Sequence, residues 1–210
     1  MRTLTKEMQA QLKPAKALQL LKEGNQRFVN NLKINRNLLQ QVNETATGQY
    51  PFAFILSCID SRTSAELIFD QGLGDIFSCR IAGNVLNNDI LGSMEFACKV
   101  AGSKIIVVLG HTKCGAIKGA CDNINMGNLS TLLAKVKPAI EAANSNTANQ
   151  STDNIAFVEK VAKLNVDLVL QQIPRRSPII AELIQIGEVA LVGGMYNVET
   201  GLVEFYEDEN

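Results

Sequence analysis

The sequence predicts an α/β fold, with a central, mostly parallel β-sheet flanked by helices, an antiparallel edge strand and an N-terminal helical arm. Two short and almost wholly apolar runs, at 51–57 and 104–110, are typical of strands that a sheet buries on both faces. Between them, helical patterns alternate with a further strand candidate, which favours parallel strands joined by right-handed crossovers. The 210 residues have room for a single domain, 1–210, with a helical arm and connection at 1–50 and the α/β core at 51–210.

The N-terminal segment predicts one helix and one connection. Residues 14–31 begin with a proline suited to a first helical turn and place Leu18, Leu21 and Phe28 at roughly helical spacing. We therefore expect an amphipathic helix there. Residues 32–50 are rich in Asn, Gln and Thr and show no firm period, so we interpret them as a surface connection.

The rest of the chain continues the alternation. Between the two apolar runs we expect a helix at 64–71, a strand at 75–82 and a helix at 89–100. Further helical patterns follow at 129–143, at 154–172 and from Ser177 onward. The polar stretch 144–153 predicts a loop between helices, and the last two apolar runs, 189–197 and 201–207, predict a hairpin at a sheet edge.

Charge and hydropathy exclude two classes of partner. The chain has 20 Lys and Arg against 21 Asp and Glu, so no basic excess is present to bind a polyphosphate backbone, and nucleic acid is not an expected partner. No apolar run approaches the roughly 18 residues that a membrane span requires, so no membrane partner is expected.

The N-terminus and the cysteines predict a cytoplasmic location. The first residues include Arg2, Lys6 and Glu7 and contain no apolar core of the kind found in signal peptides. Five cysteines are an odd number, which fits reduced thiols better than a disulfide framework. A periplasmic location becomes the expectation if a leader has been removed from the sequence.

Polar and thiol side chains follow the first and third predicted strands at the point where each ends. Cys58, Asp60 and Arg62 come directly after 51–57, and His111 and Cys114 come directly after 104–110. Because ligands bind beyond the carboxyl ends of parallel strands, we expect these residues to meet at one edge of the sheet. Two thiolates and one imidazole suit Zn²⁺ and leave a fourth position for water, as in catalytic zinc sites.

A plainer interpretation stays open for the same residues. An isolated His-x-x-Cys can arise by chance, and free cysteines are often simply buried, as we expect for Cys79, Cys98 and Cys121. Asp60 and Arg62 could form an ordinary surface ion pair, worth about 0 to 1 kcal/mol. A carboxylate and a guanidinium at a strand end are costly to bury without a function or a partner, which favours the metal site.

Three motifs stand in order along the chain: CIDSR at 58–62, RIAGN at 80–84 and GHTKCGA at 110–116. Together they resemble the β-class carbonic anhydrases, and the similarity runs from GNQRF at 24–28 to MYNVETGLVEF at 195–205. The resemblance implies a Zn²⁺ cofactor held by Cys58, His111 and Cys114, with Asp60 and Arg62 as a catalytic pair beside it. It also implies reversible hydration of carbon dioxide to bicarbonate and a proton, by attack of zinc-bound hydroxide, in a homodimer or homotetramer.

One position bears on the subclass. Open-site, plant-type members carry a glutamine nine residues before the first cysteine ligand, and this chain has Gln49 within Gly-Gln-Tyr-Pro at 48–51. The resemblance therefore implies that Gln49 donates to a substrate oxygen across a dimer interface; the alternative is an ordinary loop amide. The absence of tryptophan agrees, because closed-site members use one in their effector pocket.

The resemblance also implies a substrate pocket with apolar walls. The matching positions are Phe77, Ala82 or its neighbour Ile81, Gly83, Phe96 and Gly115. Phe96 stands where a tyrosine is common. Each apolar position has an alternative interpretation as core, and the alternative for Gly83 is a simple turn after the strand.

Two other functions remain open, and one mechanistic expectation follows from composition. The same scaffold could hydrolyse CS2 or COS, or the chain could be a non-enzymatic zinc or bicarbonate-binding regulator, which intact Asp60 and Arg62 disfavour. With one histidine in the chain, no second imidazole can move protons. We therefore expect proton release through buffer, water chains or carboxylates.

Overall fold

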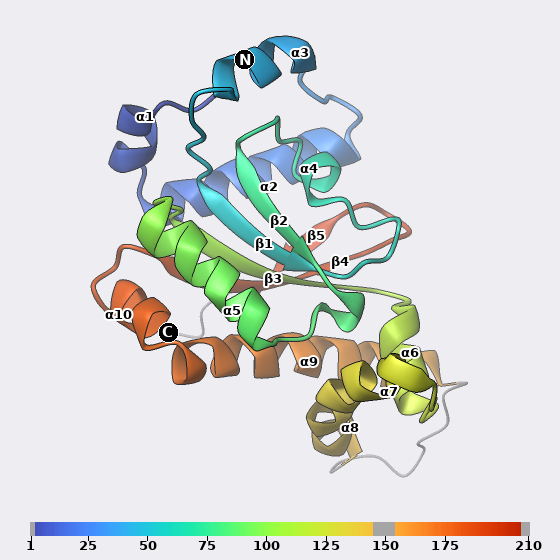
Figure 1. Cartoon of the computed structure of the whole chain (residues 1–210). Coiled ribbons are helices and arrows are strands. Elements are labelled where there is room, and N and C mark those ends of the chain that lie inside the picture. Colours follow the sequence, from blue (N-terminus) through green and yellow to red (C-terminus); the bar gives the residue numbers. More distant parts are fainter. Residues whose placement is uncertain (1–2, 145–153, 207–210) are drawn as a thin grey trace.

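The computed structural model describes residues 3–144 and 154–206 and contains a five-stranded sheet with the order β2-β1-β3-β4-β5 (Figure 1). The strands are β1 (Ala53–Ser57), β2 (Ile76–Arg80), β3 (Ile105–His111), β4 (Ala190–Tyr196) and β5 (Val203–Phe205). The first four are parallel, and β5 pairs antiparallel with β4. The predicted mostly parallel sheet with an antiparallel edge strand is confirmed, and so is the closing hairpin.

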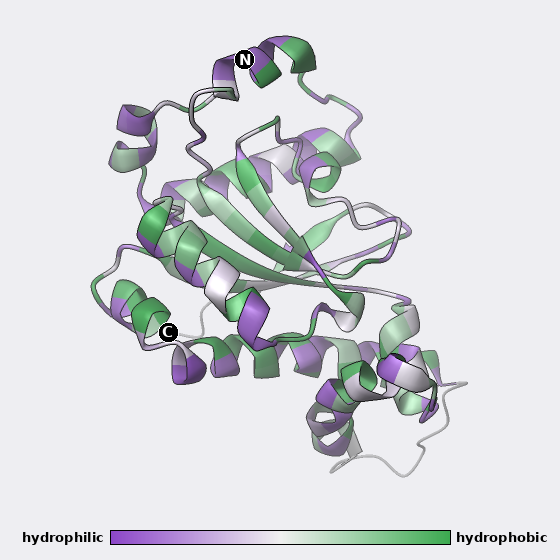
Figure 2. Ribbon diagram, in the orientation of Figure 1, coloured by the Kyte–Doolittle hydropathy of each residue, from purple (hydrophilic) through white to green (hydrophobic). Residues whose placement is uncertain are grey.

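The two apolar runs form the centre of the sheet, where every residue of β1 and β3 is buried. Alternate side chains point to opposite faces. Phe54 and Leu56 join one core cluster, whereas Ala53 and Ile55 join the other. Burial on both faces explains the continuous apolar pattern, which is visible as green strands in Figure 2.

Helices cover both faces of the sheet (Figure 1). On one face α2 (Pro14–Val29) and α4 (Ala65–Ile68) contribute to the core. On the other face lie α5 (Asn88–Glu95), α9 (Ile155–Arg176) and α10 (Pro178–Gln185). The sheet is thus the middle of three layers, as the alternating pattern predicted.

The interpretation of 32–50 as a plain connection was wrong, because it contains α3 (Leu38–Thr45). The helix begins at Asn37, whose side chain accepts from the Gln40 N–H at 3.0 Å. Its buried residue is Gln41, whose side-chain Oε1 accepts from the Leu73 N–H at 3.2 Å. Since a polar side chain faces inward, the apolar period that signals a helix is missing.

Several helix boundaries also differ from expectation. Two further helices were not predicted, α1 (Lys6–Gln11) and α6 (Gly115–Cys121), and α4 is shorter than 64–71. The stretch 89–100 ends in a π-helical turn, Phe96–Val100. The pattern at 129–143 is divided into α7 (Gly127–Leu133), a 3₁₀ turn (Ala134–Val136) and α8 (Lys137–Asn144). The predicted loop at 144–153 lies outside the described residues apart from Asn144.

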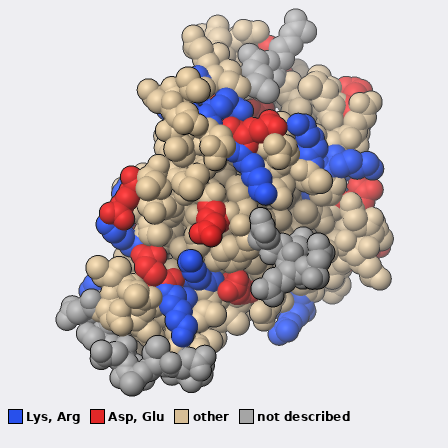
Figure 3. Space-filling view, turned by 180° about the vertical axis from the view of Figure 1, so that it is seen from behind, with Lys and Arg blue, Asp and Glu red and all other residues tan. Residues whose placement is uncertain are grey.

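The described part of the chain has no helix long and apolar enough to cross a membrane. On the face shown in Figure 3, acidic and basic side chains are interspersed. This mixture accords with the formal net charge of −1.

The GNQRF segment anchors α2 to the rest of the core. Asn25 Nδ2 donates to the Gly201 carbonyl at 2.9 Å, and its Oδ1 accepts from the Val203 N–H at 2.8 Å. A Cβ on Gly24 would lie 1.8 Å from the Phe69 carbonyl oxygen. Only glycine allows this close contact between α2 and the end of α4.

Gly24→Ala should therefore destabilise the protein, by about 1 to 3 kcal/mol in the free energy of unfolding, because the backbone must move to admit the methyl group. Gly92→Ala is the matched control, since a Cβ there meets nothing within 4 Å. It should be neutral or stabilising by about 0.5 to 1 kcal/mol, as expected in a helix interior. Urea denaturation at equal protein concentration measures the free energy of unfolding of both variants. Equal changes in the two variants would contradict the requirement for glycine at position 24.

Candidate metal centre

Cys58, His111 and Cys114 meet at the carboxyl edge of the sheet, where β1 and β3 end. Their ligand atoms all lie within 4.8 Å of one another, and all three residues are buried. The two sulfur atoms are 3.9 Å apart. The structure thus brings together the three residues that the sequence predicted as metal ligands.

Cys58 is held with its sulfur facing backbone donors. The N–H of Gly83 donates to Cys58 Sγ at 3.3 Å, and the N–H of Asp60 also points to it. Gly83 has a φ of 68°, a left-handed conformation that favours glycine, so the RIAGN motif supplies this donor with little strain. These donors favour the thiolate form.

The two sulfurs are close enough for a hydrogen bond between them. This contact with Cys114 lowers the pKa of Cys58 to about 4. The same contact, together with burial, raises the pKa of Cys114. The Cys114 sulfur also receives N–H groups from Ala116 and Ile117 at the start of α6. Binding of a cation here would displace thiol protons, because metal ligation requires thiolates.

The ring of His111 is oriented by its own turn. Nδ1 lies 2.9 Å from the Thr112 carbonyl oxygen. Because a carbonyl can only accept, Nδ1 carries the proton and Nε2 carries the lone pair. Nε2 is buried and has no hydrogen-bond partner among the described residues.

This arrangement fits a metal ion. A buried imidazole lone pair without a partner is costly unless a ligand occupies it. Two thiolates and one neutral imidazole are the ligands that Zn²⁺ prefers, and three protein ligands leave a fourth position open. The donor set at this edge of the sheet therefore suits catalytic rather than structural zinc.

Asp60 and Arg62 form a two-point ion pair beside the cluster. Arg62 Nε donates to Asp60 Oδ1 at 2.9 Å, and Nη2 donates to Oδ2 at 2.8 Å. The Arg62 N–H also donates to Oδ1, at 3.0 Å. The Arg62 guanidinium holds the pKa of Asp60 well below its usual range, so the carboxylate stays ionised.

Sequence reasoning missed the groups that support this pair. Arg80 Nε donates to the Cys58 carbonyl at 3.0 Å, and its Nη2 donates to the Asp60 carbonyl. Thr63 Oγ1 donates to the same two carbonyls, each at 2.9 Å. Arg80 opens the RIAGN motif, but only the pairing of β2 with β1 reveals its partner.

The expected pocket residues fall into two groups. The first group adjoins the cluster and consists of Ala82, Gly83 and Gly115. The N–H of Gly83 donates to Cys58, and Gly115 follows Cys114 directly in the sequence. Gly115 is exposed, and a Cβ there would meet nothing within 4 Å. These positions border the cluster within one chain.

Gln49, Phe77 and Phe96 lie elsewhere in the subunit. Gln49 is exposed and lines a hollow with Lys104 at the opposite, amino edge of the sheet. Phe77 pairs with Phe54 in the sheet register and contacts the ring of Phe96, with centroids 6.3 Å apart. Within a single chain, the structure does not bring these three side chains to the ligands.

The other cysteines behave as packing residues. Cys98 is buried, and burial raises its pKa to about 12. Cys79 and Cys121 are half-buried, and burial raises the pKa of each. All three are free thiols that a neutral environment keeps protonated.

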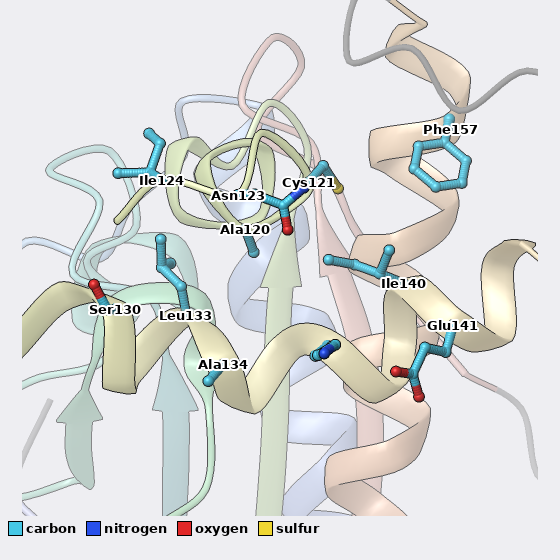
Figure 4. Close-up of a pocket in the computed structure, with 11 residues that line it drawn as sticks. Ala120, Cys121, Asn123, Ile124, Ser130, Leu133, Ala134, Ile140, Glu141 and Phe157 are labelled. Atoms are coloured by element: carbon cyan, nitrogen blue, oxygen red, sulfur yellow. The ribbon is translucent and has the colours of Figure 1, made fainter. Parts of the chain in front are cut away.

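A separate cavity of about 460 Å³ lies between α6, α7, α8 and the start of α9 (Figure 4). Apolar side chains such as Leu133, Ile140 and Phe157 line much of it, together with Cys121. None of the three ligands lines this cavity.

Comparison with known proteins agrees with this geometry. A family model described as carbonic anhydrase matches residues 53–203. Carbonic anhydrase 2 of Mycobacterium tuberculosis is 38% identical over 191 residues, which cover 90% of this chain and 90% of that protein. A carbonic anhydrase of Mycolicibacterium smegmatis is 34% identical, covering 91% of this chain and 92% of its own length. The solved β-carbonic anhydrase CafA of Aspergillus fumigatus is similar with a TM-score of 0.73 at 26% identity, covering 93% of this chain and 91% of that one.

Arg62→Gln should raise the pKa of Asp60 towards its unperturbed value of about 3.9. In the wild type the carboxylate should stay ionised well below that value, because Arg62 binds both oxygens. The lowered pKa stabilises the fold above about pH 4, and this contribution is lost as the pH falls towards the folded-state pKa. Carboxyl ¹³C NMR measures the pH midpoint of the Asp60 titration in each protein. Equal midpoints in the wild type and Arg62→Gln would refute the role of Arg62 in lowering the pKa of Asp60.

Proposed function

The chain belongs to the β class of the carbonic anhydrase family and is a carbonic anhydrase, and we propose that it hydrates carbon dioxide at a zinc ion held by Cys58, His111 and Cys114. The single observation that carries the zinc assignment is the buried cluster of two sulfurs and one unpartnered imidazole nitrogen, within 4.8 Å of one another. The reaction is reversible and yields bicarbonate and a proton.

Zinc at such a site lowers the pKa of a water molecule to about 7, which supplies a nucleophile near neutral pH. The protein contributes orientation. Asp60 Oδ1 accepts two hydrogen bonds from Arg62, whereas Oδ2 accepts one. Oδ2 therefore keeps a lone pair that can accept a hydrogen bond from the attacking oxygen and aim it at the carbon of CO2.

Carbon dioxide is small and apolar, so its pocket needs apolar walls more than donors. Ala82 is half-buried next to Gly83 and borders the ligands. In our proposal Ala82 and the exposed backbone of Gly115 form the part of the pocket that one chain supplies. Bicarbonate leaves through the same opening.

The decisive test compares the wild type with Cys58→Ser in stopped-flow assays with CO2 and with CS2, alongside zinc analysis. We expect about one zinc per wild-type chain, CO2 hydration as the main activity and loss of both zinc and activity in Cys58→Ser, because a serine hydroxyl is a poor zinc ligand. Cys98→Ser, which changes a buried thiol outside the cluster, is the control for zinc content. Stoichiometric zinc without CO2 hydration, or faster turnover of CS2, would overturn the proposal.

Proton release should depend on buffer, because the single histidine is committed to the cluster. No other imidazole exists to carry a proton from the site to solvent. We expect turnover at saturating CO2 to rise with buffer concentration at constant ionic strength and pH. Turnover that is independent of buffer concentration would exclude this route.

We also propose an open-site enzyme that works as a homodimer or homotetramer. The two-point bond between Asp60 and Arg62 supports the open form, because it keeps the carboxylate on arginine. Exposed apolar side chains support assembly, with Phe96 53% and Val100 72% exposed. In this proposal a second copy supplies Gln49, Phe77 and Phe96 to the pocket.

Gln49→Ala should lower kcat/KM for CO2 about tenfold while zinc content stays unchanged, since a donor to the substrate oxygen is lost. Sedimentation velocity gives the assembly state in parallel. A monomeric active enzyme, or X-ray absorption at pH 8 showing carboxylate ligation of zinc by Asp60, would contradict the open-site assembly.

A further inference from the structure

The turn between the two ligands His111 and Cys114 contains a strained residue. Lys113 has a φ of 54°, in the left-handed region that residues with a Cβ seldom adopt. Such a conformation persists only where the surroundings hold it. The groups that hold Lys113 therefore bear on the geometry of both neighbouring ligands.

The peptide unit that joins Thr112 to Lys113 is hydrogen-bonded through both its carbonyl oxygen and its N–H. Its carbonyl oxygen, on Thr112, lies 2.9 Å from His111 Nδ1. Its N–H, on Lys113, donates to Glu159 Oε1 at 2.8 Å. One peptide group thus connects a carboxylate on α9 with the imidazole ring.

We propose that Glu159 is a positioning residue that acts on His111 through this peptide unit, so that the carboxylate, the peptide and the imidazole form one chain of hydrogen bonds. A charged acceptor on the N–H strengthens that bond and polarises the carbonyl at the other end of the peptide. The carbonyl then holds the Nδ1 proton more firmly and leaves Nε2 a better ligand. Carboxylates that bind ligand histidines directly do the same in many zinc sites, and here a peptide stands between the two groups.

The next peptide unit, which joins Lys113 to Cys114, contacts the proposed catalytic pair. The Lys113 carbonyl, which follows the held N–H, accepts a long hydrogen bond from Arg62 Nη2 at 3.5 Å. Arg62 Nη2 also binds Asp60. Fixing Lys113 therefore restrains the guanidinium that orients Asp60.

Glu159 is half-buried near the start of α9, so Glu159→Ala should fold. Glu159→Gln keeps an acceptor without the charge. Glu199→Ala is the matched control, because Glu199 binds the side chain of the same lysine, Nζ to Oε1 at 2.7 Å, at an exposed position and leaves the peptide untouched.

The inference rests on the proposed zinc site, and the test separates the two. The first measurement is zinc affinity by competition with a chelating dye, using tag-free protein. Glu159→Ala should bind zinc about tenfold or more weakly, Glu159→Gln should fall between that variant and the wild type, and Glu199→Ala should match the wild type.

The second measurement is the tautomer of His111 in zinc-free protein, from long-range ¹H–¹⁵N spectra. The chain has one histidine, so the ring signals need no assignment. The wild type should show the proton on Nδ1, and Glu159→Ala should shift both ring nitrogens towards a mixture of tautomers.

Wild-type protein that binds no zinc would refute the proposed function, whereas the tautomer remains measurable. Wild-type zinc affinity together with unchanged ring shifts in Glu159→Ala would overturn the role of Glu159 alone. If Glu159→Ala fails to fold, the same two measurements on Glu159→Gln test the proposal. A zinc affinity and His111 ring shifts identical to those of the wild type would then overturn it.

Discussion

The parallel pairing of β1 with β3 is the constraint on which the site depends. Ser57 stands opposite Leu109 in this register, so Cys58 and His111 emerge from neighbouring strands at the same edge. A shift of one residue would turn every side chain of a strand to the opposite face of the sheet. Because both strands are buried throughout, with different residues suited to each face, such a shift is strongly disfavoured. The packing of two apolar runs therefore determines the position of the metal ligands.

Sequence reasoning succeeded where the signal was local. The apolar runs identified the central strands. The residues directly after them identified the cluster that the structure brings together, since strand direction alone places Cys58 and His111 at one edge. The spacing of Asp60 and Arg62 likewise anticipated a pair that the structure joins by three hydrogen bonds. In these cases the chemistry lies within a few residues of a predictable element.

It failed where the determining contact is distant or polar. The inward face of α3 is occupied by Gln41, so the helix has no apolar stripe, and the small residues of α6 hide its period. Arg80 and Glu159 bind backbone groups far away in sequence, which no spacing rule reports. The roles expected for Gln49 and Phe77 stay predictions, because within one subunit these side chains lie away from the cluster.

The division of the ligands between two strands has a consequence for how the protein matures. His111 and Cys114 sit on one short turn, but Cys58 joins them only when β1 and β3 are paired. Before that step a chain offers at most two of the three ligands in one place, and two ligands bind a metal weakly. If the cluster binds zinc as proposed, metal loading would follow sheet formation, and the bound ion would then cross-link two strands that are distant in the sequence.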